Sequence, residues 1–134
     1  MAKEAIGSNA TFTGPQQGLT ILGKHCYAYS GEYSVDNTET FLLNFQSAGK
    51  RYIMANVSLG SNSAENEDYR FQIYFNGQEV FGGVFNNQGL HSIGTWPIPI
   101  MIPPATEVKI SLQNIADTDS RAWSVHIVGE VYNL

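Results

Sequence analysis

The stretch from Asp68 to Phe85 constrains the fold more than any other part of the chain. Apolar and polar side chains alternate along residues 69–75, which is the period of an extended strand with one buried face. Asn76-Gly77 follows at once and suits a two-residue type I′ turn, because both central residues of that turn need positive φ. Residues 78–81 then return antiparallel, so the sequence predicts a β-hairpin. The side chains expected to face its core are Tyr69, Phe71, Ile73 and Phe75. Those expected on the opposite face are Arg70, Gln72 and Tyr74.

Further alternating segments lie on both sides of this hairpin and are separated by turn clusters. The additional strands expected from this pattern are 19–29 (with an irregularity at Gly23), 32–35, 39–46, 52–59, 107–114 and 122–132. Residues 39–46 and 52–59 are predicted to pair as a second hairpin, with Phe41, Leu43 and Phe45 sharing one face of the first strand. Residues 96–104 contain four prolines, which favours an edge strand or a segment that crosses between sheets.

The number and spacing of these segments predict an all-β fold. About eight short strands without a helical period indicate an antiparallel two-sheet sandwich with a jelly-roll-like topology. An immunoglobulin-like Greek key is the alternative strand order. At 134 residues the chain suits one domain, which we expect over residues 19–134. Residues 1–18 are mostly polar and predict an irregular N-terminal arm, in which Ile6 and Phe12 are isolated apolar side chains.

Composition and charge exclude several functional classes. The net charge is −5 and no basic run exceeds Lys50-Arg51, which argues against direct binding of nucleic acid. No apolar run approaches the ~20 residues of a membrane-spanning helix, and no secretion signal is visible, so we expect synthesis in a cytoplasm and no membrane partner. Only 14% of the residues are charged, which fits a surface partly covered by a protein partner. Cys26 is the single cysteine and is expected to be a small buried residue.

The sequence shows no catalytic or metal-binding signature. His25, His91 and His126 lack the spacing of metal ligands, and there is no nucleophile elbow, so we predict a non-enzymatic protein without a metal or cofactor. Acidic residues gather at 65–68 and 117–119, where solvated turns are the expected structure and calcium binding stays an open alternative. Tyr74 and Trp96 are less suited to the core than the other aromatics, and we predict that they face a partner.

Several segments together carry a resemblance to a known group of proteins. They are Ala28-Tyr29-Ser30-Gly31, residues 39–45, the strand and turn at 69–77, residues 100–104 with Glu107-Val108, residues 113–117 and residues 128–132. This set resembles the small β-sandwich virion proteins of tailed bacteriophages, particularly marine ones, which are head-decoration and related structural proteins. The resemblance covers residue 28 to the C-terminus and leaves the arm out.

The resemblance implies a function on the virion. It implies a capsid decoration or cement protein that binds the major capsid protein, as a homo-oligomer and commonly a trimer, on the capsid surface and without a cofactor. Ile6, Phe12, Tyr74 and Trp96 are the residues we expect at partner contacts. The alternative is a lectin-like module of a tail fibre or spike that binds host glycans through exposed aromatic side chains.

Overall fold

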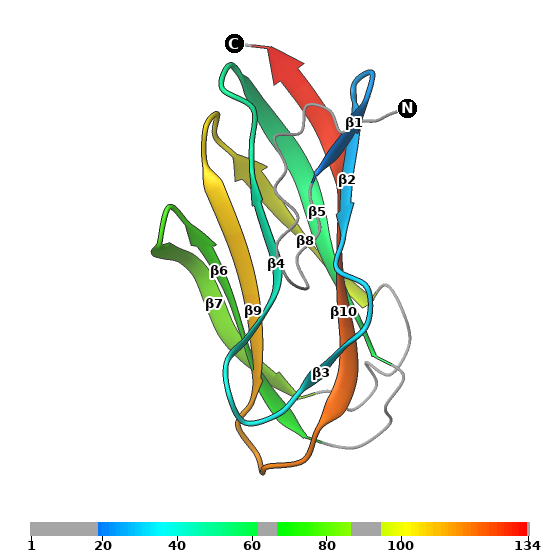
Figure 1. Ribbon diagram of the computed structural model, residues 1–134, viewed down its shortest axis with the longest axis vertical. Coiled ribbons are helices and arrows are strands. Elements are labelled where there is room, and N and C mark those ends of the chain that lie inside the picture. The colour runs from blue at the N-terminus through cyan, green and yellow to red at the C-terminus, as the bar shows by residue number, and fades with distance from the viewer. Residues whose placement is uncertain (1–18, 62–66, 87–94, 134) are drawn as a thin grey trace.

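Two antiparallel β-sheets pack face to face in the computed structural model of this chain, which describes residues 19–61, 67–86 and 95–133 (Figure 1). The predicted all-β sandwich is therefore confirmed. The predicted N-terminal arm lies outside the described residues. Within these residues, no helix is long and apolar enough to cross a membrane.

The larger sheet, sheet A, has six strands and the smaller, sheet B, has four. Sheet A consists of β1 (Thr20–Leu22), β2 (His25–Tyr29), β3 (Tyr33–Val35), β5 (Arg51–Ser61), β8 (Thr95–Ile102) and β10 (Arg121–Asn133). Sheet B consists of β4 (Thr40–Gln46), β6 (Asp68–Phe75), β7 (Gln78–Asn86) and β9 (Glu107–Asn114). The order is β1-β2-β10-β5-β8 in sheet A, where β3 also pairs with β10, and β4-β9-β6-β7 in sheet B.

This strand order is that of a jelly roll. When the three-residue strands β1 and β3 are set aside, β2-β10-β5-β8 faces β4-β9-β6-β7, and the chain crosses from one sheet to the other in the manner of two Greek keys. The expected count of about eight strands becomes ten because the predicted strand at 19–29 is a hairpin of β1 and β2, and because the proline-rich segment forms a strand of its own, β8. Gly23, with a φ of 63°, lies in the turn between β1 and β2.

The hairpin of β6 and β7 is confirmed at its turn and on its inner face. Asn76 and Gly77 have φ values of 53° and 79°, as a type I′ turn requires. Tyr69, Phe71 and Ile73 are buried. Phe75 at the strand end is half-buried and packs against the same core.

The predicted hairpin of residues 39–46 and 52–59 is wrong. Strand β4 pairs with β9 in sheet B, whereas β5 pairs with β10 and β8 in sheet A. The connection at 47–50 crosses between the sheets and is tied to the second crossing at 103–106. Ser47 Oγ donates to the carbonyl of Pro103 at 2.7 Å and accepts from the amide of Thr106 at 2.9 Å. Alternation correctly indicated which side chains of β5 face inward, but it does not specify the neighbouring strand.

The side chains of β4 that face the core also differ from those predicted. Its register with β9 shifts between Phe41 and Leu43, so Leu42 and Leu43 are both buried while Phe41 is only half-buried. An irregularity of this kind changes which side chains face the core on either side of it. Phe41 therefore lies on the outer face of sheet B, where its ring contacts that of Tyr74.

Candidate interaction surface

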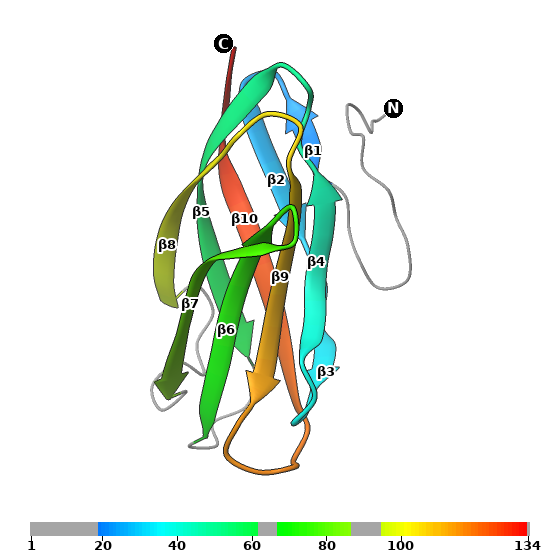
Figure 2. The same cartoon turned by 90° about the vertical axis from the view of Figure 1, so that its left-hand side faces the viewer.

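Strand β7 forms one edge of sheet B and exposes apolar side chains along its length. It lies at the same side of the sandwich as β8, the edge strand of sheet A (Figure 2). The exposed fractions are 50% for Val80, 42% for Phe81 and 57% for Val84. By the register with β6, Phe81 lies on the inner face of sheet B, across from Ile73, and Val84 lies on the outer face, across from Arg70. The edge therefore leaves apolar side chains exposed on both of its faces, where a protein contact could cover them.

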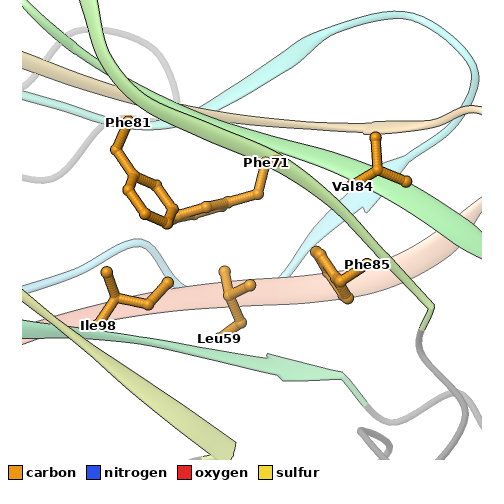
Figure 3. A pocket seen from close by; sticks show the side chains of 7 residues that line it. Leu59, Phe71, Phe81, Val84, Phe85 and Ile98 are labelled. Carbon is orange, nitrogen blue, oxygen red and sulfur yellow. The ribbon is translucent and has the colours of Figure 1, made fainter.

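An apolar groove runs between β7 and β8. It has a volume of about 250 Å³ and is lined by Leu59, Phe71, Phe81, Gly83, Val84, Phe85 and Ile98. Phe71 and Phe81 meet edge to face at 5.9 Å and lie opposite Leu59 and Ile98 (Figure 3). Because these lining residues have no polar side chain, the groove can select a partner only by shape and apolar contact.

The charged side chain of β7 does not protect this edge. Glu79 accepts a hydrogen bond from Gln72 Nε2 at 3.1 Å, and its carboxylate lies over Gly82. Gln72 belongs to the outer face of sheet B, opposite the groove, so the negative charge is held on that face. Natural edge strands are commonly protected by a lysine, a proline or an inward-pointing charge. Strand β8 has two prolines of this kind, Pro97 and Pro99, and β7 has none.

Of the four residues predicted to face a partner, the structure describes the side chain of Tyr74. Tyr74 is half-buried on the outer face of sheet B, and its hydroxyl donates to Glu39 Oε2 at 2.7 Å. This hydrogen bond to a carboxylate raises the pKa of Tyr74, and Ser111 Oγ donates to the same oxygen at 2.7 Å. Trp96 lies in β8, but its side chain is not among those that the structure describes. Ile6 and Phe12 are also outside the described residues.

Glu67 of the first acidic cluster lies beside Asp117 and Asp119 of the second. Carboxylate oxygens of Glu67, Asp117 and Asp119 lie within 4.8 Å of one another. Arg121 Nη2 lies 3.4 Å from Glu67 Oε2 and 3.2 Å from Asp119 Oδ2, so a guanidinium supplies positive charge to the cluster. Asn114 Nδ2 also donates to Asp117 Oδ1 at 3.1 Å. The cluster is thus built into a hydrogen-bond network, which sequence reasoning missed because its members lie up to 54 residues apart.

Burial distinguishes Glu67 from the other two carboxylates of this network. Glu67 is 5% exposed and accepts a hydrogen bond from the hydroxyl of Tyr69 at 3.1 Å, so the expectation of a solvated turn is wrong at this residue. Burial raises the pKa of Glu67, and the neighbouring Asp117 carboxylate adds to the effect. In contrast, the exposed Asp117 accepts the backbone N–H of Asp119 at 2.9 Å, which lowers the pKa of Asp117.

Replacement of Glu67 by glutamine is expected to change how stability depends on pH. A raised pKa in the folded state means that the folded protein holds this proton more tightly than the unfolded chain. The contribution of Glu67 to stability is therefore complete below pH 4.5, the ordinary pKa of a glutamate, and is lost as the pH rises through its folded-state pKa. Relative to the wild type, Glu67→Gln should gain stability as the pH rises above 4.5.

Urea unfolding at a series of pH values measures this difference. Asp117→Asn is the matched control with the opposite sign, because the lowered pKa of Asp117 gives a contribution that is lost as the pH falls below 3.8. A constant difference between Glu67→Gln and the wild type from pH 4 to 7 would contradict the account of Glu67.

The other residues considered for chemistry do not form a site in the described part of the chain. His25 and His126 lie on the outer face of sheet A, where the His126 ring meets Tyr29 edge to face at 5.4 Å. His91 is outside the described residues. Cys26 is 1% exposed, as expected, and burial raises the pKa of its thiol to about 11.

Comparison with known proteins identifies a structure with a similar fold but does not identify a protein family. No protein-family model matches the chain, and no curated protein matches it. Among solved structures, it is similar to the insecticidal delta-endotoxin Cry8Ea1 from Bacillus thuringiensis, with 16% sequence identity and a TM-score of 0.35. The match covers 81% of this chain and 18% of the toxin chain. At this TM-score the likeness bears on neither family nor function.

Proposed function

We propose that this chain is a non-enzymatic structural protein of a phage virion, a capsid decoration or cement protein that binds the major capsid shell and stabilises it. The observation that best supports the proposal is the apolar edge of β7 with its adjoining groove. Such a surface is suited to contact with other proteins, because burial of apolar area drives protein association.

The way the sandwich is held together fits a protein that resists mechanical stress on a shell. The connections at 47–50 and 103–106 both cross between the sheets, and a backbone hydrogen bond from Ala105 to Ala48 at 2.8 Å joins them in addition to the bonds of Ser47. Sheets that are linked at their crossings resist sliding past each other. A protein that opposes outward pressure on a shell needs this kind of rigidity.

The surroundings of Tyr74 favour protein assembly over the alternative of glycan binding. A lectin-like face uses the ring of an exposed aromatic side chain for stacking on sugar. Here the ring of Tyr74 is half-buried and packs against Phe41 at 5.8 Å, while its hydroxyl is occupied by Glu39. Glycan binding therefore remains the second candidate and is separated from the first by experiment.

The polar arm supplies the second part of the proposal. We assign Ile6 and Phe12 as the side chains that would contact the shell. Ordering an arm residue costs roughly 1–2 kcal/mol, and burial of each apolar side chain returns about 1.5–3 kcal/mol, so Ile6 and Phe12 can each offset the ordering of only the few residues around them.

Removal of residues 2–14 is expected to weaken attachment to shells at least about tenfold, while the sandwich stays folded. The measurement is co-sedimentation of purified protein with shells assembled from the major capsid protein encoded in the same genome. Circular dichroism of the shortened chain provides the folding control.

Two results would count against these assignments. Equal occupancy of the full and shortened chains would remove the arm from the account. Failure of the full chain to bind shells, together with specific binding to a glycan array that Tyr74→Ala or Trp96→Ala abolishes, would replace the decoration proposal with the glycan-binding one.

A further inference from the structure

We propose that two copies of this chain pair face to face through the outer faces of their sheets A, around a two-fold axis that crosses the strands at Val128. The pairing rests on the proposed function, because it names the contact between copies of a structural protein, and it leaves the β7 edge of each copy free for the shell. It is tested on purified protein without shells. The pairing can therefore fail while shell binding holds, and shell binding can fail while the pairing holds.

The outer face of sheet A exposes apolar side chains on four adjacent strands. Residues of β2, β10, β5 and β8 alternate between the core and this face. The exposed apolar side chains of the face, with their exposed fractions, are Tyr29 (48%) on β2, Val128 (52%) and Tyr132 (40%) on β10, Met54 (46%) on β5 and Met101 (53%) on β8. Met54 lies directly across from Met101 and diagonal to Val128, so the apolar surface is continuous over three strands.

The charge of this face points to a second copy as its partner. On the described part of the face, the acidic side chain is Glu130 and the basic ones are His25 and His126. The outer face of sheet B carries more charged side chains, which are Asp68, Arg70, Glu79, Glu107 and Lys109. Contacts between copies of one chain are rich in apolar and aromatic side chains and poor in charge. The chain has a net charge of −5, so two copies repel each other least where the sheet A face meets itself.

The few charges of the face select the axis. A two-fold contact brings the same patch of two copies together, and a carboxylate buried in it needs a partner. An axis along β10, or one across the strands at Glu130, would set the two Glu130 carboxylates against each other. Val128 lies midway between His126 and Glu130 on β10, so an axis across the strands at Val128 sets Glu130 of each copy over His126 of the other.

The other side chains near this axis also match. Val128 and Tyr27 would each meet their own equivalents, and His25 of one copy would meet Tyr29 of the other, which sets aromatic rings together. Sheets that pack face to face keep their strands within about 30° of each other, so these positions stay opposed near the axis. Glu130 Oε1 accepts a hydrogen bond from Tyr132 at 3.1 Å, and a carboxylate can accept a further one from an imidazole N–H.

The area of the face suits a dimer of moderate affinity. Four strands about 4.8 Å apart, over the residues from Ser124 to Tyr132 of β10, cover roughly 500 Å² in projection on each copy. Accessible area exceeds projected area, so the pair would bury about 1,200 Å², the lower end of the range for specific interfaces. We therefore expect a dimer that is populated at about 100 μM and dissociates on dilution. A two-fold contact closes on two copies, so the pairing favours a dimer over the trimer that the resemblance implies.

A lysine at the centre of the face tests the surface. Val128→Lys would place a charge on the axis, against the same charge of the other copy, and should weaken the dimer at least about tenfold in sedimentation equilibrium. Val84→Lys is the matched control, because it makes the same change at a similarly exposed side chain on the outer face of sheet B and should leave the dimer unchanged. Circular dichroism checks that both variants are folded. Wild-type protein that is monomeric at about 1 mM, a trimer, or an equal loss in the two variants would overturn the proposal.

An exchange of charges tests the axis. His126→Glu should weaken the dimer at least about tenfold, because it sets two carboxylates together. Glu130→Lys added to the same chain should restore the dimer to within about threefold of the wild type, because each introduced glutamate then faces a lysine of the other copy. Within one copy these two positions lie about 13 Å apart along β10, so the recovery can come only from contact between copies. A double variant that stays as weak as His126→Glu would overturn the pairing about Val128.

Discussion

Replacement of Trp123 by alanine is expected to lower the free energy of unfolding by about 3–5 kcal/mol, the range measured for large aromatic side chains removed from a core. Trp123 is 1% exposed. Its ring lies 4.9 Å from that of Tyr69 and 5.7 Å from that of Phe85, so it joins β10 of one sheet to β6 and β7 of the other. Loss of the indole would leave a cavity that these strands cannot close without moving apart.

Thermal and urea unfolding followed by circular dichroism measure this loss. Folded domains have about 5–15 kcal/mol of stability, so Trp123→Ala would remove a large share of it. Leu22→Ala is the control, because truncation of an exposed side chain should change stability by no more than about 0.5 kcal/mol. Equal stability of the two variants would mean that the contact between the sheets does not depend on Trp123.

Replacement of Gly129 by alanine is expected to destabilise the protein by about 3 kcal/mol, at the upper end of the range for overpacking. Gly129 lies in β10 opposite Ala55 of β5, near the middle of sheet A. An added Cβ would overlap the carbonyl oxygen of Met54 and lie 2.6 Å from Ala55 Cα. Because these are backbone atoms of a paired strand, they cannot turn aside as a flexible side chain would.

The matched control is Gly83→Ala, another glycine within a strand. A Cβ at Gly83 meets nothing within 4 Å, so this variant should unfold at the same urea concentration as the wild type or slightly higher. If both glycine variants lost the same stability, the effect would come from strand glycines in general and not from close approach at Gly129.

The local parts of the fold could be predicted from the sequence because their signals are local. Asn76-Gly77 specified the turn of the β6–β7 hairpin, and alternation specified the inward side chains of β9. The partners of β4 and β5 could not be predicted, because alternation gives the face of a strand and not its neighbour. The register shift after Phe41 leaves one trace in the sequence, three consecutive apolar residues at 41–43, which strict alternation does not produce.

The candidate site was harder to predict for the same reason. The exposure of Val80 and Val84 follows from the place of β7 at a sheet edge, and edge position is a property of the whole topology. Tyr74 was correctly placed on the outer face, but the carboxylate that holds its hydroxyl belongs to Glu39, which is 35 residues away. The alternation of a strand can identify a side chain that faces away from the core, but it does not identify the residue that forms a hydrogen bond with that side chain.

The central position of β10 has a consequence for how the protein is made. This strand pairs with β2 and β3 on one side and with β5 on the other, yet it is the last of the described strands to leave the ribosome. Until then, β2 and β5 have no common neighbour, and their hydrogen-bonding edges stay open through most of translation. Sheet A can therefore close only after synthesis of β10, and until then the open edges of β2 and β5 are available for pairing with other chains.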